Sequence, residues 1–86
     1  MFITKQTCKT NILATFEEIE KCEDKIEFIK ESISKIPVDS KGNAIREYDI
    51  VFLEKHFRDM ENEKAKLSEL RGRFKYYVNL FDELKN

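Results

Sequence analysis

His56 is the only histidine in the sequence, and it belongs to a row of side chains that could bind a metal or transfer a proton. Asp49 precedes it by seven residues and Glu63 follows it by seven, so on a helix all three project from one side. Seven residues span about 10 Å of helix, which is too far for one ion to join them. Leu53 also stands where a Glu-x-x-His metal motif needs its glutamate. We therefore expect no metal and no cofactor, and interpret His56 as paired with neighbouring charges.

Cys8 and Cys22 are the two candidates for thiol chemistry. They are too few for the disulfide framework of a small secreted protein, and their separation is not that of a metal-binding pair. One histidine and two scattered cysteines, without a Gly-rich loop, cannot supply a nucleophile, a base and an oxyanion hole. We predict a protein that is not an enzyme, with reduced thiols and with Cys22 as a small core residue. A small helical enzyme using Lys64 and Arg71 is the third-ranked alternative.

The basic and aromatic part of the sequence spans residues 64–77. It carries five Lys or Arg residues against one acidic residue, Glu69, and ends on Tyr76 and Tyr77. Single-strand nucleic-acid binders combine such cations with aromatic rings on which bases stack. Internal pairing is the alternative explanation for Lys64, which we expect to face the acidic residues at positions 17–20. That pairing leaves four candidate nucleic-acid contacts, which are Arg71, Arg73, Lys75 and Tyr76.

A stripe of apolar residues near the carboxy terminus predicts a protein-binding surface. Its members follow the i, i+3, i+4, i+7 spacing of a helix that inserts its apolar face into a groove. Packing of the same stripe on its own hairpin is the alternative. The candidate partner-binding residues are Phe74, Tyr77, Val78, Phe81 and Leu84.

Two helical segments must position these residues. Isoleucines and Cys22 recur in steps of three and four between Ile12 and Ile36, interrupted only by Thr15, which is the pattern of a coiled-coil seam. We place the first helix at about residues 11–35, capped by Thr10 or Asn11, with a start as early as Thr4 as the alternative. Pro37 ends it, and the turn-rich residues 36–43 fold the chain back.

The second helical pattern runs from residue 44 towards the end of the sequence. Its central row repeats every seven residues and contains Leu53, Met60, Leu67, Phe74 and Phe81. Gly72 interrupts it, at a cost of about 1 kcal/mol relative to alanine. We predict a second helix at about 44–71, followed by an amphipathic helical segment at 73–85, and leave open whether the helix kinks or breaks at Gly72 or continues through it. Ile50 and Phe57 lie on one shoulder of the central row, and Phe16, Phe28 and Phe52 lie just outside the seam.

Length and composition bound the remaining choices. The 86 residues form a single helical domain, residues 1–86, with 38% charged residues, two glycines and one proline, which indicates an all-α antiparallel hairpin. A net charge of −1 disfavours nucleic acid as the main partner. No segment approaches the roughly 20 apolar residues of a membrane span, so we expect a cytoplasmic protein. The leading hypothesis is a non-catalytic inhibitor, regulator or adaptor, of the kind phages and mobile elements encode, which binds a protein partner and self-associates into a bundle. A nucleic-acid-associated regulator using residues 64–77 is the alternative.

Overall fold

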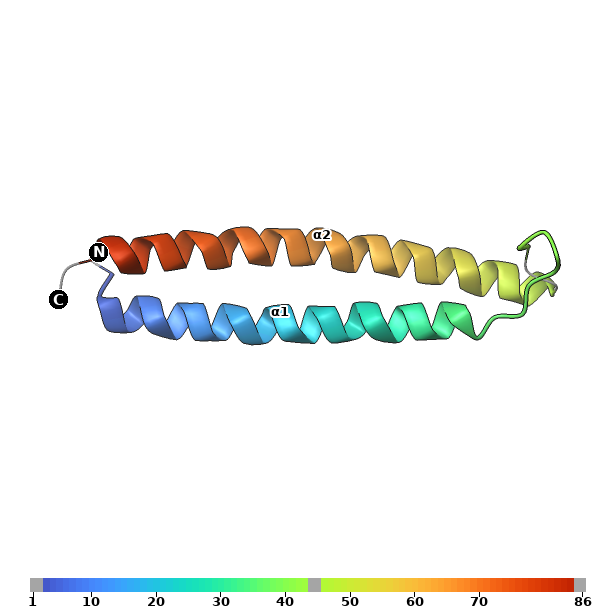
Figure 1. Cartoon of the computed structure of the whole chain (residues 1–86), viewed down its shortest axis with the longest axis horizontal. Coiled ribbons are helices and arrows are strands. Elements are labelled where there is room, and N and C mark those ends of the chain that lie inside the picture. The colour runs from blue at the N-terminus through green and yellow to red at the C-terminus, as the bar shows by residue number, and fades with distance from the viewer. Residues whose placement is uncertain (1–2, 44–45, 85–86) are drawn as a thin grey trace.

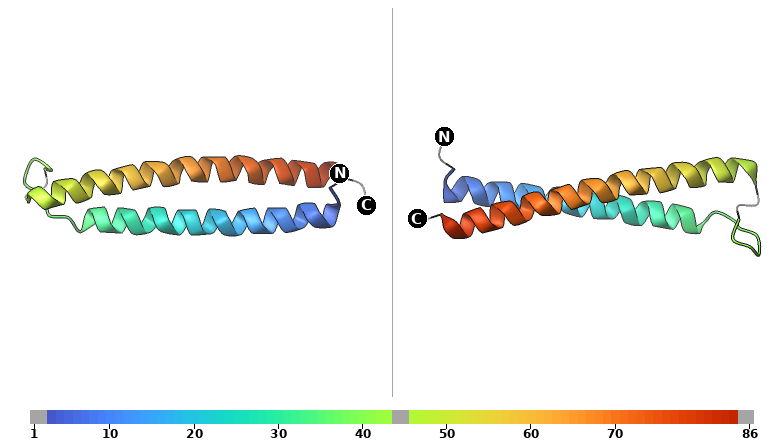
Figure 2. Two further views of the ribbon diagram at one scale, coloured as in Figure 1. Left: turned by 180° about the vertical axis from the view of Figure 1, so that it is seen from behind. Right: turned by 90° about the horizontal axis from the view of Figure 1, so that it is seen from above.

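Two long helices joined by one loop form the computed structural model of the protein, which describes residues 3–43 and 46–84. α1 spans Lys5–Ser34 and α2 spans Glu47–Glu83. They lie side by side and antiparallel over the whole length of α1 (Figure 1). Seen from above, they cross at a shallow angle (Figure 2). The predicted all-α antiparallel hairpin is therefore confirmed.

The hairpin is a rod. Its extents are 61 × 19 × 15 Å and its radius of gyration is 19.0 Å, whereas a compact domain of this length has a radius of gyration of about 12 Å. No helix in the described part of the chain is long and apolar enough to cross a bilayer. A rod this thin has an interior only one row of side chains deep.

α1 begins earlier than the sequence pattern suggested. Thr4 is its N-cap, because the Thr4 hydroxyl oxygen accepts a hydrogen bond of 3.1 Å from the backbone N–H of Thr7. Cys8 lies one turn further on and is fully buried. The predicted start near residue 11 is therefore too late, and the alternative start at Thr4 is the correct one. The missed signal is Cys8, which extends the three-and-four spacing of the isoleucines by one step.

The seam of α1 consists of two rows of residues that each repeat every seven positions. One row is all isoleucine, and the other begins with three short side chains. Thr15 belongs to the second row and stays buried, because its hydroxyl donates to the backbone oxygen of Asn11 at 2.7 Å. The rows are Ile12, Ile19, Ile26 and Ile33, and Cys8, Thr15, Cys22 and Ile29, with Ile36 at the next position of the second row just beyond the end of α1.

α2 supplies the facing half of the seam. The buried core joins Ile19, Cys22 and Ile26 of α1 to Leu67 and Leu70 of α2. Met60 and Phe74 pack against this core from either side along α2. The hydrophobic core cluster thus lies in the middle of the rod, while Cys8 towards one end and Asp49 towards the other are buried outside it.

The loop between the helices is held by Asp39. Its carboxylate accepts hydrogen bonds from the backbone N–H groups of Lys41, at 2.9 Å, and Asn43, at 3.0 Å. Gly42 has a φ of +84°, a conformation that favours glycine. Residues 36–43 thus form a connection, and α2 begins at Glu47 rather than near 44, although residues 44 and 45 lie outside the described chain.

α2 continues through Gly72 without a break. Within the described residues the segment after Gly72 is the continuation of α2 to Glu83 and no third helix is seen, which decides the alternative that the sequence left open. Packing explains the continuity. Phe74 and Tyr77, just beyond Gly72, contact α1, and these contacts offset the low helix propensity of one glycine.

Replacing Ile26 with aspartate should unfold the hairpin. Ile26 is 8% exposed in the central core, and an uncompensated buried charge costs roughly 3–5 kcal/mol. Thermal denaturation followed by circular dichroism measures the effect. Phe28→Asp adds the same charge two residues away on an exposed side chain and should change stability by less than about 1 kcal/mol. Equal melting temperatures for the two variants would contradict the seam assignment.

Replacing Gly72 with alanine should stabilise the protein. A Cβ at position 72 meets no atom within 4 Å, so the gain in helix propensity of about 0.5–1 kcal/mol is free of strain. The melting temperature should rise by roughly 2–8 °C. Gly42→Ala is the matched control and should destabilise, because its positive φ strains an alanine. A lower melting temperature for Gly72→Ala would show that the helix breaks there.

Candidate interaction surface

The rod has two flanks, one on each side of the seam. Positions seven apart on a helix share a stripe, and positions two apart lie about 200° from each other. Phe57 and Asp59 of α2 therefore face opposite flanks. One side, the Phe57 flank, carries the α2 stripe Ile50, Phe57, Lys64, Arg71 and Val78. The other side, the Phe28 flank, carries the α2 stripe Phe52, Asp59, Lys66 and Arg73, together with Phe28 of α1.

Large apolar side chains are exposed at the loop end of the rod. Phe28 is 69% exposed and Phe52 is 51% exposed. Tyr48 and Phe52 pack edge to face with ring centroids 6.4 Å apart, and the Arg46 guanidinium lies 4.7 Å from the Tyr48 ring centroid. The exposed large apolar side chains at this end, counting both flanks and the outer side of α2, are Phe28, Val38, Tyr48, Ile50, Val51, Phe52 and Phe57.

Each flank has an open hollow at the loop end. On the Phe28 flank, a hollow of about 470 Å³ lies over Phe28 and Ile29. Its polar rim is formed by Asp24, Lys25, Asp59, Asn62 and Glu63. On the Phe57 flank, a hollow of about 380 Å³ is lined by Gly42, Asn43, Ile50, Leu53, Glu54 and Phe57.

Polar residues in the seam explain why apolar residues lie outside it at this end. The row Asp49, His56 and Glu63 occupies the α2 seam positions that Leu70, Tyr77 and Leu84 fill nearer the termini. Asp49 is 5% exposed, and Glu63 contacts Cys22 of α1. The loop half of the rod therefore hides polar groups and exposes aromatic ones, the reverse of a self-sufficient hairpin.

His56 and its two acidic neighbours each have their own environment. His56 is half-buried, Asp49 pairs with Arg46 at 2.7 Å, and Glu63 lies 4.0 Å from the ammonium group of Lys25. Within residues 3–43 and 46–84, no three His, Cys, Asp or Glu side chains are placed to hold a metal ion. Asp49 and Glu63 thus form ion pairs within the hairpin.

The two thiols bond to the opposite helix. Cys8 donates to the backbone oxygen of Tyr77 at 3.1 Å, and Cys22 donates to the backbone oxygen of Glu63 at 3.1 Å. Burial raises the pKa of the Cys22 thiol, and its hydrogen bond of 3.2 Å to the Glu63 carboxylate raises it further. A thiol that resists ionisation is a weak nucleophile.

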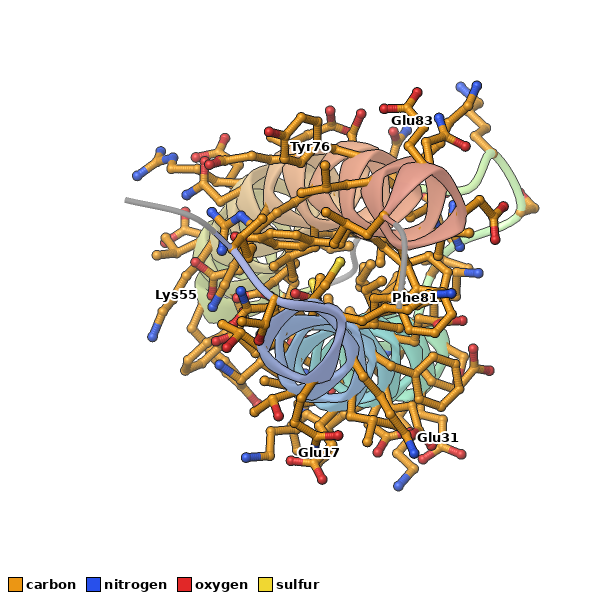
Figure 3. All side chains as sticks on the ribbon, turned by 90° about the vertical axis from the view of Figure 1, so that its left-hand side faces the viewer. Glu17, Glu31, Lys55, Tyr76, Phe81 and Glu83 are labelled. Atoms are coloured by element: carbon orange, nitrogen blue, oxygen red, sulfur yellow. The ribbon has the colours of Figure 1, made fainter. Side chains whose placement is uncertain are left out.

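Three of the five candidate partner-binding residues of the carboxy-terminal stripe, Phe74, Tyr77 and Phe81, contact α1. Phe74 lies 6.1 Å from Phe16 between ring centroids, and the ammonium group of Lys5 lies 4.8 Å from the Phe81 ring centroid. Figure 3 shows Phe81 beside α1, whereas Tyr76 projects from the outer side of α2. All five are half-buried. These contacts agree with the alternative in which the stripe packs on its own hairpin, because α1 reaches back to Lys5.

The four candidate nucleic-acid contacts do not share one face. Arg71 lies on the Phe57 flank and Arg73 on the opposite flank, while Lys75 and Tyr76 are exposed. Arg73 pairs with Glu18 at 3.9 Å and with Glu69 at 3.3 Å. We expected Lys64 to face positions 17–20 of α1; the contact between Cys22 and Glu63 places it level with Lys21, one residue beyond them.

Comparison with known proteins gives no significant match to a family model, to a curated protein or to a solved structure. The function must therefore be argued from the rod and its two flanks.

The raised pKa of Cys22 predicts a loss of stability at alkaline pH. The folded chain keeps a thiol proton that the unfolded chain loses, so the free energy of unfolding should be constant near neutrality and fall as pH rises through the ordinary thiol range and above it. Each unit of pKa difference corresponds to about 1.4 kcal/mol. Urea titrations at several pH values measure it, with Cys22→Ala as the control. Parallel pH profiles for the two proteins would contradict the raised pKa.

Proposed function

We propose that this protein is a non-catalytic interaction module, an inhibitor, regulator or adaptor, that binds a protein partner through the loop end of its Phe28 flank. The single observation that supports the proposal is the placement of side chains in the loop half of the rod, where the aromatic residues Phe28, Tyr48 and Phe52 are exposed while the acidic residue Asp49 is buried. Contiguous exposed apolar surface on a small protein commonly marks a binding site.

The hollow on the Phe28 flank has the composition of a protein interface. Phe28 and Ile29 give it an apolar floor, and charged and amide side chains surround that floor. Protein interfaces share this arrangement of an apolar centre and a polar rim. Three of the five rim residues are acidic, so the complementary partner is a helix or segment with an apolar anchor flanked by basic side chains.

A second candidate function, nucleic-acid binding, has weaker support. The observation in its favour is a surplus of basic residues at the end of the rod that holds the termini, where Tyr76 is 62% exposed. Its candidate contacts lie on different sides of α2, and Arg73 is engaged by two acidic residues. Salt dependence separates the two functions, because phosphate contacts weaken steeply between low and moderate salt.

Truncating Phe28 and Phe52 to alanine should abolish partner binding without unfolding the protein. Aromatic anchors at interfaces commonly contribute 2 kcal/mol or more, which corresponds to about a thirtyfold loss of affinity for one residue. The measurement is capture from a lysate of the native host, quantified by mass spectrometry and followed by titration of the captured protein. Val51→Ala removes an exposed apolar group from the outer side of α2 and is the matched control.

Equal capture by the double variant and the parent protein would contradict the proposed site. Capture that disappears after nuclease treatment, or at moderate salt, would favour the nucleic-acid function instead. Circular dichroism should show the same helicity for the parent, Val51→Ala and the double variant, because all three positions are exposed.

A further inference from the structure

The rod exposes more surface than a monomer of its mass normally does. Its accessible surface is 6960 Å², whereas a folded monomer of 10.3 kDa has about 5,400 Å². The excess is roughly 1,600 Å² per chain. Two copies that each cover this excess would bury about 3,000 Å² together, which lies within the range of permanent homodimers.

Charges on the Phe57 flank are arranged in two opposite stripes. α1 contributes an acidic stripe of Glu20, Glu23 and Glu27, and α2 contributes the basic residues Lys64 and Arg71. Glu23, Glu27 and Arg71 line one shallow hollow together with Lys30, which lies on the loop side of the acidic stripe, so the stripes belong to the same flank. Within the described chain, none of these five residues forms an ion pair of 4.0 Å or less; the observed pairs join other side chains.

The heights of the two stripes along the rod also match. Cys22 contacts Glu63 across the seam, so in this antiparallel pair Glu23 and Lys64 are offset by two residues, or about 3 Å along the rod. By the same register Glu20 lies one residue from the level of Lys64, and Arg71 lies about 9 Å beyond Glu20 towards the termini. Apolar side chains stand beyond the charged stripes at both ends, Leu13 and Phe16 towards the termini and Ile50 and Phe57 towards the loop, and all four are exposed.

We infer that a second copy of this chain covers the Phe57 flank, with both loops at the same end and the two-fold axis along the rod. A rotation about that axis keeps every residue at its own height and places α1 of each copy opposite α2 of the other. Glu23 then faces Lys64 of its partner, twice per dimer, and the apolar ends of the flank meet their counterparts. This dimer does not cover the Phe28 flank, so the proposed partner site stays accessible. The inference therefore adds to the proposed function and does not depend on whether that function is correct.

The reverse arrangement, with the loops at opposite ends, would follow from the overall charge of the rod. Residues 22–63 carry eleven acidic and seven basic side chains, and the rest of the chain carries six acidic and nine basic. Attraction between the oppositely charged halves of two rods acts over long distances, and interactions beyond about 8 Å are screened at physiological salt. Interactions between charged stripes in direct contact are not screened in this way. In the reverse arrangement α1 faces α1, which brings Glu20 and Glu23 of the two copies together. Repulsion between these adjacent acidic residues therefore disfavours the reverse arrangement and favours the dimer with both loops at the same end.

Charge exchange between the stripes tests the arrangement. Glu23→Lys and Lys64→Glu should each weaken the dimer at least tenfold in sedimentation experiments, because each places like charges opposite one another. Mixing the two variants should restore dimerisation, because the cation introduced by Glu23→Lys in one chain then faces the anion introduced by Lys64→Glu in the other. Pairing within one chain cannot produce that rescue. A monomeric parent at micromolar concentration, or a stronger dimer for Glu23→Lys alone, would overturn the inference.

Distances between spin labels on the dimer test the orientation independently. Labels at Ser40→Cys in the loop should lie no farther apart than about twice the 19 Å width of the rod. Labels at Lys9→Cys, near the opposite end, should also be close. If both label pairs lie near the 61 Å length of the rod apart, the loops are at opposite ends of the dimer. If only the Ser40→Cys labels are close, the two rods touch end to end. Either result overturns the inference. Parent protein carried through labelling verifies that buried Cys8 and Cys22 stay unlabelled.

The two proposals fail separately. A parent protein that is monomeric but loses its captured partner on truncation of Phe28 and Phe52 would refute the dimer alone. A dimer that binds no protein through Phe28 would refute the proposed partner site alone.

Discussion

The close approach of α1 to α2 is the constraint on which the rest of the rod depends. It is made by short side chains in one seam row of α1, where Cys8, Thr15 and Cys22 are all buried. A thiol sulfur lies only two bonds from Cα, so it reaches a carbonyl oxygen of the opposite helix only when the two backbones are near. Both cysteines do this, at positions two heptads apart on each helix. These paired contacts set a single register for the whole hairpin.

That register decides which side chains are hidden. It places Asp49, His56 and Glu63 in the seam at the loop end, where a longer apolar row would have closed the rod on itself. The aromatic residues of this half are left on the two flanks. The middle of the rod thus holds the core cluster, and the loop end exposes aromatic side chains.

Most of the fold could be predicted from the sequence because it depends on local signals. The isoleucine spacing, Pro37 and the turn residues each act within one or two helical turns, and they predict the hairpin correctly. The start of α1 was missed because Cys8 was treated as an isolated thiol, although it continues the spacing of Ile12 and Ile19. Whether the helix continues through Gly72 could not be decided from the sequence, because helix propensity is local, whereas the packing of Phe74 and Tyr77 on α1 is not. The candidate site was harder to predict than the fold, because a helix that starts near residue 11 does not reach the carboxy-terminal aromatics, whereas α1 begins at Lys5. The exposure of Phe16, Phe28, Phe52 and Phe57 was already implied by their positions outside the seam.

The position of the helix ends gives the rod an unequal response to mechanical force. α1 begins and α2 ends at the same end of the rod (Figure 1). Tension applied between these two points would peel the helices apart from Lys5 and Phe81 towards the loop, and only one layer of the seam would bear the force at a time. Tension along the axis, applied between the loop and one terminus, would instead shear every layer of the seam at once. The same hairpin would therefore unfold at low force when its two helix ends are pulled apart and resist a higher force when it is pulled along its axis.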